Sequence, residues 1–407
     1  MRVAMLGWEL PPFSSGGLGV HCHYLTAELA ARGVEIDFFM PKTGKRVAVP
    51  WMNVIEVEPP ATAQARQVIA AMGPYSASAV VTAEGRTSRA VAAPTGFFES
   101  IEFYNAFAAG VLGKRHSERA YDLIHGHDWL TARAAVAAKA ATGLPLVVTM
   151  HSTEFDRTGG IGPWEWIVDF ERTAVGAADR VIAVSGMLRD VVVKKLGADS
   201  RKVRVIHNGV EAGRFLSRSG KQDGSDRRLG PKVVLFHGRL SVQKRPEFFL
   251  AAARLVLEKE PDALFVVSGK GELLPKLVEQ SIDLGISDRL LFSGYVPDEL
   301  LQEAYASACV YVMPSVSEPF GITALEAMAS GVPCIVSKTS GVTEVSKHCL
   351  KVDFWDTHEL ANKIVAVLRY APLRKMMSEN ALLEAADATW AKAAQKTIGV
   401  YGEVLSK

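Results

Sequence analysis

VMPSVSEPFGITALEAMASGVP, residues 312–333, is the stretch that most directly indicates the architecture. It predicts a buried strand that ends near Pro314, a short loop, and a helix that starts near Ile322 and stops at Gly331, before Pro333. The apolar run before the loop is continuous rather than alternating, which is typical of a parallel strand covered on both faces. A strand that leads through a short loop into a helix is part of a β-α-β unit, so the segment predicts an α/β fold.

The same pattern of short apolar runs and helical segments repeats through most of the chain and predicts doubly wound parallel sheets. The polar, charged segment 216–230 interrupts it and is predicted to be a linker. We therefore expect a first domain over 1–215, a second over 231–384, and a C-terminal helix at about 385–407 that packs back on the first. The predicted strands lie at 3–6, 35–40, 123–125, 146–150, 181–184, 203–206, 233–236, 264–267, 290–292, 310–313 and 334–336.

Composition narrows the class of protein. The chain has 407 residues, 48% hydrophobic and 22% charged, which suits two domains with large cores. A formal net charge of +2 gives no basic field for nucleic acid. The four cysteines form no CxxC pair, and we find neither a signal-peptide pattern nor an apolar stretch of about 18 residues. We expect a reduced, cytoplasmic protein without a transmembrane segment; whether it forms a homo-oligomer stays open.

Residues 312–333 contain two acids and a helix start that are candidate ligand-binding groups. Glu318 lies in the predicted loop, and Glu326 lies eight residues later inside the helix. The first helical amides, near Gly321, Ile322 and Thr323, are free to bind an anion, and the helix dipole adds positive potential. This arrangement suits a sugar diphosphate, with amides for phosphate and carboxylates for hydroxyls. A surface loop with an acidic cap explains the same residues, and the residues alone leave both interpretations open.

The stretch resembles the E-x7-E signature of the retaining glycosyltransferases that include glycogen, starch and sucrose synthases. Three further segments resemble that family in the right order. They are HGRLSVQKRPEFFLAA from His237, GWELPPFSSGGLGVH from Gly7, and DLIHGHDWLTA from Asp122, whose H-x-H-D-W is found in glycogen and starch synthases. The resemblance spans nearly the whole chain. It implies the GT-B fold, in which two Rossmann-like domains face each other with the site in the cleft.

The resemblance assigns the donor-binding residues. Arg239 and Lys244 follow the predicted strand 233–236, where two cations can neutralise a diphosphate; a solvated basic loop is the alternative. In the family the residue matching Glu318 binds the sugar and that matching Glu326 binds the ribose. The loop tyrosine after strand 290–292 is a candidate to stack on the base. The predicted donor-binding set is Gly17, Arg239, Lys244, Tyr295, Glu318, Phe320, Gly321, Ile322, Thr323 and Glu326.

A glycine-rich turn follows the first predicted strand. Gly16, Gly17 and Gly19 can lend amides to phosphate, although glycines also simply make tight turns. Bacterial glycogen and starch synthases carry a lysine where this chain has Ser14. Glu9 matches the family's loop acid, with a structural role as the alternative.

Histidines follow two other strands. A lone histidine such as His151 is more often structural, but the resemblance implies that it faces the transferred sugar. The H-x-H-D segment, with His125 and His127, suggests a metal site. We expect no metal and no cofactor, because the family needs no ion and the segment shows no third ligand. Asp128 and Trp129, together with Glu9, are predicted to line the acceptor side.

The resemblance also implies a mechanism. Retention usually indicates a carboxylate nucleophile, but both signature acids bind donor in this family. Transfer then occurs on one face, with the leaving phosphate helping to deprotonate the acceptor. The predicted catalytic residues are His151, Arg239, Lys244 and Glu318. We expect glucosyl transfer from ADP-glucose or UDP-glucose to the non-reducing end of an α-1,4-glucan. The alternatives are a lipid or small-molecule acceptor, a sugar-nucleotide epimerase, or an inactive nucleotide-sugar sensor.

Overall fold

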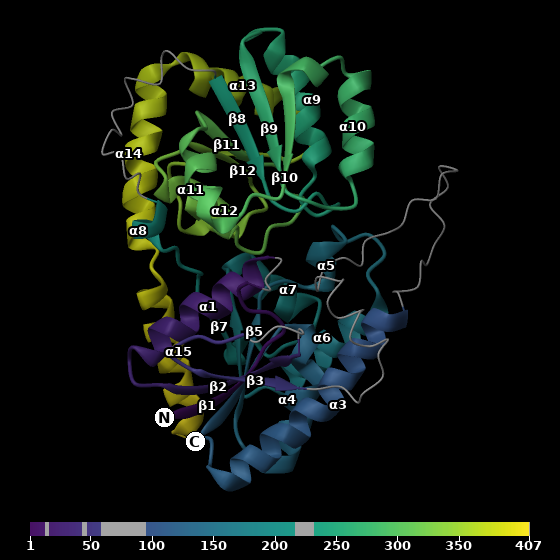
Figure 1. Ribbon diagram of the computed structural model, residues 1–407, viewed down its shortest axis with the longest axis vertical. Helices are drawn as coiled ribbons and strands as arrows, with labels where there is room; N and C mark the ends of the chain where they lie inside the picture. The colour runs from purple at the N-terminus through teal and green to yellow at the C-terminus, as the bar shows by residue number, and fades with distance from the viewer. Residues whose placement is uncertain (13–15, 43–46, 58–94, 216–231, 407) are drawn as a thin grey trace. The chain divides into compact units, whose positions relative to one another are not determined.

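The computed structural model describes residues 1–12, 16–42, 47–57, 95–215 and 232–406 (Figure 1). The predicted linker 216–230 and Ser14 lie outside the described residues. The chain divides into two compact units. The first comprises Met1–Phe155, Gly160–Ile206 and Trp390–Lys407, and the second comprises Asp156–Gly159 and His207–Thr389. The C-terminal helix thus belongs to the first unit, and the second unit begins before the predicted position 231.

The first unit is built on a seven-stranded parallel sheet in the order β3-β2-β1-β4-β5-β6-β7. This order reverses direction between β1 and β4, as in Rossmann-like folds, whose ligands bind at that point beyond the carboxyl ends of the strands. The strands are β1 (Arg2–Leu6), β2 (Glu35–Pro41), β3 (Asn53–Val57), β4 (Leu123–His127), β5 (Leu146–Met150), β6 (Arg180–Ala183) and β7 (Val203–Val205).

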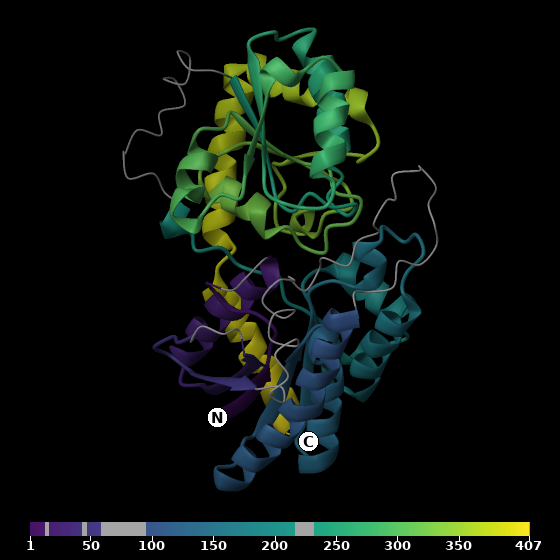
Figure 2. The ribbon, with the colours of Figure 1, turned by 45° about the vertical axis from the view of Figure 1, so that its right-hand side comes forward.

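Helices cover this sheet. α4 packs on both α3 and α6, and α1 packs on α15, so the end of the chain lies beside its beginning (Figures 1 and 2). The helices are α1 (Gly17–Ala30), α3 (Thr95–Glu118), α4 (Ala132–Thr142), α5 (Glu154–Arg157), α6 (Glu165–Ala177), α7 (Gly186–Lys194) and α15 (Trp390–Leu405).

The second unit repeats the plan with a six-stranded parallel sheet in the order β10-β9-β8-β11-β12-β13. Its direction reverses between β8 and β11. The strands are β8 (Lys232–His237), β9 (Ala263–Ser268), β10 (Leu290–Gly294), β11 (Val310–Met313), β12 (Cys334–Ser337) and β13 (Leu350–Val352). The helices are α8 (Ala212–Phe215), α9 (Pro246–Leu257), α10 (Leu274–Asp283), α11 (Asp298–Ala306), α12 (Ile322–Ala329), α13 (Thr357–Arg369) and α14 (Ala371–Asp387).

The predicted doubly wound α/β class is confirmed, because every strand pairing in both sheets is parallel. Burial of the continuous apolar runs explains the architecture: β11 is buried along its whole length. In the second unit Phe236, Phe249 and Phe265 form a buried aromatic row, with neighbouring ring centroids 5.8 and 5.5 Å apart. None of the helices in the described ranges has the length and hydropathy that crossing a lipid bilayer requires.

Candidate active site

The loops after β8 and β11 bring opposite charges together at the switch point of the second unit. Lys244, beyond β8, forms an ion pair with Oε2 of Glu318, beyond β11. Ser315 Oγ donates a hydrogen bond of 3.2 Å to the same carboxylate oxygen. Both charged side chains are largely buried, 17% exposed for Lys244 and 10% for Glu318, so solvent screens their interaction weakly. Arg239 is half-buried in the same loop as Lys244.

Glycines allow the loops around this ion pair to approach closely. A Cβ at Gly269, after β9, would lie 1.9 Å from the carbonyl oxygen of Gly238, after β8. Gly269 also has a φ of +134°, a conformation that other residues rarely adopt. The backbone beside Arg239 and Lys244 is therefore held by direct contact with the next loop.

The start of α12 presents backbone amides. Gly321 precedes the helix with a φ of +106°, and a Cβ there would lie 2.9 Å from Cε of Met313. No described side chain caps the helix, so the amides near Ile322 and Thr323 keep the anion-binding potential of a helix start. Thr323 Oγ1 accepts a hydrogen bond of 2.9 Å from the Tyr311 hydroxyl, which fixes its rotamer.

Glu326 is a buried acid in α12, 8% exposed. The Tyr305 hydroxyl donates a hydrogen bond of 2.9 Å to its Oε2. Burial raises the pKa of Glu326 to about 7, with Asp298 acting in the same direction and Tyr305 and Arg214 against it. A carboxyl group that takes up a proton near neutral pH is an unusual feature, and such groups gather at functional sites.

The two aromatic donor candidates lie in different surroundings. Phe320 is 2% exposed, and its ring centroid lies 6.0 Å from that of His207, so it supports the loop rather than presenting a face. Tyr295, after β10, is 58% exposed, with the Lys270 ammonium 5.6 Å from its ring centroid. Only the second ring offers an accessible stacking surface.

The loop after β1 in the first unit is tied to its own helix. Glu9 is 3% exposed, and its Oε1 accepts a hydrogen bond of 3.0 Å from the amide of Gly19 in α1. This contact gives Glu9 a structural role, the alternative left open by the sequence. Gly17 is the first residue of α1.

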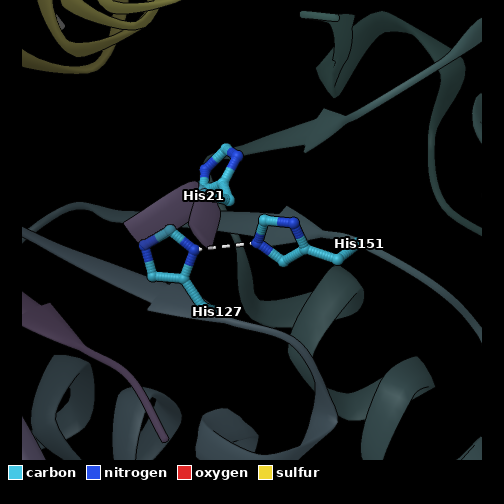
Figure 3. Close-up of side chains that lie close together, drawn as sticks. All are labelled: His21, His127 and His151. Atoms are coloured by element: carbon cyan, nitrogen blue, oxygen red, sulfur yellow. Dashed lines mark hydrogen bonds between the residues drawn. The ribbon is translucent and has the colours of Figure 1, made fainter. Parts of the chain in front are cut away.

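Three imidazoles meet beyond the carboxyl ends of β1, β4 and β5 (Figure 3). His127 ends β4, His151 follows β5, and His21 comes from α1. Nδ1 of His127 lies 3.1 Å from Nε2 of His151, and one ligand nitrogen from each of the three rings lies within 4.8 Å of the others. The expectation that the H-x-H-D segment lacks a third ligand is thus wrong: His21 and His151 join His127, although they lie far from it in the sequence.

Burial disfavours the charged form of two of these rings, those of His127 and His151. It lowers the pKa of His127 and His151 well below the usual value, and the neighbouring histidines lower both further. The pKa of His125 falls to about 3, again mainly through burial. His127 and His151 therefore present neutral imidazoles, which donate or accept hydrogen bonds and ligate metals.

Asp128 and Trp129, predicted to line the acceptor side, are both buried in the first unit. Asp128 is 1% exposed with a φ of +55°, and its Oδ1 accepts a hydrogen bond of 2.6 Å from the His151 amide. Trp129 is 1% exposed and packs edge-on against Trp166, with ring centroids 5.5 Å apart. Asp128 thus positions the His151 backbone, and Trp129 packs in the core of the first unit. That these residues lie on the acceptor side stays a prediction.

Sequence reasoning missed His21. It lies within α1, behind the glycine turn, so neither strand position nor spacing singled it out. The signal that would have found it is topological: in a 3-2-1-4-5 strand order the carboxyl ends of β1, β4 and β5 are neighbours.

Comparison with known proteins gives one consistent result. The family Glycosyltransferase Family 4 matches residues 15–214, and the family Glycosyl transferases group 1 matches residues 219–383. An uncharacterized glycosyltransferase of Methanocaldococcus jannaschii is 30% identical over 98% of both chains. A D-inositol 3-phosphate glycosyltransferase of Corynebacterium diphtheriae is 30% identical over 99% of this chain and 95% of its own. A glycogen synthase of Mycobacterium tuberculosis is 28% identical over 84% of this chain and 80% of its own.

Solved structures share the fold. Sucrose-phosphate synthase from Thermosynechococcus elongatus has a TM-score of 0.80 at 21% identity, covering 100% of this chain and 99% of that one. HepE from Anabaena, in complex with UDP-glucose, has a TM-score of 0.70 at 19% identity, with the same coverage. With both family regions matched and one relative 30% identical over almost its full length, the chain is a GT-B glycosyltransferase of the glycosyl transferases group 1 family.

Proposed function

We propose that this glycosyltransferase takes a sugar from a nucleoside diphosphate donor with retention of configuration. The observation that carries the proposal is the pairing of Lys244 with Glu318 next to the uncapped start of α12. A cation, free helix amides and a carboxylate within one loop system match the diphosphate and the sugar hydroxyls of such a donor. Glu326, one to two turns into the helix, is proposed to bind the ribose hydroxyls.

The transfer step needs little covalent help from the protein. The bond between the anomeric carbon and the diphosphate oxygen breaks, and the acceptor hydroxyl oxygen bonds to the same face of that carbon. The acceptor proton passes to an oxygen of the departing diphosphate. Arg239 and Lys244 neutralise the charge that grows on this leaving group. His151 is proposed to face the transferred sugar, as the family resemblance implies.

For the sugar and the acceptor we propose glucose, from ADP-glucose or UDP-glucose, and the non-reducing end of an α-1,4-glucan. The glycogen synthase relative and the UDP-glucose complex of HepE support this choice. A second candidate acceptor is a phosphorylated small molecule. The extent of the sequence alignments favours this second acceptor. The D-inositol 3-phosphate glycosyltransferase relative aligns with 99% of this chain, and the glycogen synthase relative with 84%.

The test is release of nucleoside diphosphate from a panel of sugar nucleotides, with maltooligosaccharide, with an inositol phosphate, or with no acceptor. Glucan-dependent release with chain growth supports the first acceptor, and release only with the inositol phosphate supports the second. NMR of the product linkage determines whether configuration is retained. Interconversion of the donor without acceptor indicates an epimerase and contradicts the proposal, as does binding of donors without any turnover.

A further inference from the structure

We infer that His21, His127 and His151 form a binding site for a divalent first-row transition metal such as Zn²⁺. The three rings belong to separate segments, α1, the end of β4, and the residue after β5, yet their nitrogens converge (Figure 3). Three imidazoles are a common ligand set for Zn²⁺ and its neighbours in the periodic table.

The distances suit a tetrahedral ion. With Zn–N bonds of about 2.0–2.1 Å, neighbouring ligand nitrogens lie about 3.3 Å apart. The His127 and His151 nitrogens are 3.1 Å apart, and no pair in the set of three exceeds 4.8 Å. Small side-chain rotations, moving nitrogens by about 1.5 Å or less, therefore bring all three to bonding distance of one ion.

His125 lies close to the three histidines but is not part of the proposed site. His125 lies next to His127, with ring centroids 4.4 Å apart, but both of its nitrogens have partners. Its Nδ1 lies 2.7 Å from the Tyr401 hydroxyl, and its Nε2 lies 2.7 Å from Thr149 Oγ1. By contrast, the converging nitrogens, Nδ1 of His127 and Nε2 of His151, face each other at 3.1 Å, so an ion would replace a contact within the cluster. The other nitrogen of His127, Nε2, is buried and has no hydrogen-bond partner among the described residues.

The surrounding contacts fix the backbone of two ligands. The His127 amide donates to Thr131 Oγ1 at 3.0 Å, and the His151 amide donates to Asp128 Oδ1 at 2.6 Å. These contacts hold the main chain from which the two imidazoles project. His151 is half-buried while His21 and His127 are buried, so the side of His151 is the route by which an ion enters.

Occupancy of this site has a consequence that rests on the proposed function. An ion bound by His151 occupies the imidazole that is proposed to face the donor sugar. The ion and the sugar nucleotide should then compete, which would make the transferase sensitive to free Zn²⁺.

The test measures binding of Zn²⁺ by calorimetry to the chelator-treated, desalted full-length protein. The wild type should bind one equivalent of Zn²⁺, and so should His23→Ala, a control on the same helix. His21→Ala and His21→Gln should bind Zn²⁺ at least about tenfold more weakly. Co²⁺ should give the visible absorption bands of a four- or five-coordinate site in the wild type and the control alone. Equal Zn²⁺ affinity in all four proteins overturns the site, and so does a wild type that lacks the Co²⁺ bands. Thermal melts followed by circular dichroism verify that each variant is folded.

A second measurement separates this inference from the proposed function. Zn²⁺ should raise the apparent KM for the sugar nucleotide in the wild type and in His23→Ala, and leave it unchanged in the His21 variants. Because the binding test needs no turnover, a protein inactive on every donor still supports or overturns the metal site. Stoichiometric binding without any effect on KM supports the site and contradicts the proposed sugar contact of His151.

Discussion

The first unit gathers three imidazoles at the carboxyl ends of its strands, whereas the second unit gathers an ion pair and a buried acid at the equivalent place. Both sheets have the same strand order around the reversal, β3-β2-β1-β4-β5-β6 in one and β10-β9-β8-β11-β12-β13 in the other. The fold thus supplies the same location twice, and the side chains decide what it binds. Charged groups suit a charged diphosphate; neutral imidazoles suit a metal ion or a sugar hydroxyl.

The largest expected effect comes from removing charge in the second unit. Lys244→Ala should lower kcat by about 10²–10³, because the leaving diphosphate loses a charge that stabilises the transition state. It also leaves the largely buried Glu318 without its ion-pair partner. Nucleoside diphosphate release at saturating donor measures this effect. Lys276→Ala, an exposed lysine in α10, is the matched control; near-normal turnover in Lys244→Ala would rule out the clamp.

The buried acid gives the second unit a pH dependence. The pKa of Glu326 is raised from 4.5 to about 7 in the folded protein. Between these two pH values the folded protein keeps a proton on Glu326 that the unfolded chain releases. Stability contributed by this group therefore falls as pH rises through that window. Relative to the wild type, Glu326→Gln should gain unfolding free energy on the order of 3 kcal/mol between about pH 4.5 and pH 8.

Urea unfolding of both proteins across this range measures the difference. Glu299→Gln, an exposed acid in α11, is the control substitution. A difference between wild type and Glu326→Gln that does not change with pH would show that Glu326 ionises as an ordinary acid. The contrast between the two units would then rest on the ion pair of Lys244 and Glu318 alone.

The sequence predicts the second site better than the first, and the reason is physical. Arg239, Lys244, Glu318 and Glu326 lie in two short segments, each attached to one strand, so linear spacing carries their arrangement. The histidine cluster depends on the order of strands in the sheet, which places the ends of β1, β4 and β5 side by side. His21 became visible only when that order was known.

Continuity of the apolar run, rather than position in the sheet, separates the strands that were predicted from those that were missed, since the edge strands β7 and β10 were predicted. Inner strands such as β11 bury both faces, and their continuous apolar runs can be recognised. β3 and β13 are edge strands with exposed positions, and β13 is only three residues long. Lys351 and Glu56 interrupt their apolar runs, so composition did not distinguish them from loops. Burial of Trp129 was likewise not visible from its sequence neighbours.

A smaller effect should follow from disturbing the neutral unit. Tyr401→Phe removes the hydroxyl next to Nδ1 of His125 and leaves a fully buried ring nitrogen unpaired. The expected loss of unfolding free energy is about 1–3 kcal/mol. Tyr370→Phe, a tyrosine 63% exposed, is the control. Equal stability of the two variants would mean that α15 is held by packing alone and that the imidazoles do not depend on it.

The smallest effect is expected at the exposed edge of the second unit. Tyr295→Ala should raise the KM for the sugar nucleotide about fivefold, corresponding to about 1 kcal/mol of base stacking. Both kcat and unfolding free energy should stay unchanged, because a ring that is 58% exposed contributes little to the core. Tyr295→Phe keeps the stacking face and should behave as the wild type. The increase should be larger with an ADP-sugar than with a UDP-sugar, since a purine offers more area to the ring. An unchanged KM with both donors would place the base elsewhere and leave the ion pair and the start of α12 as the groups that select the donor.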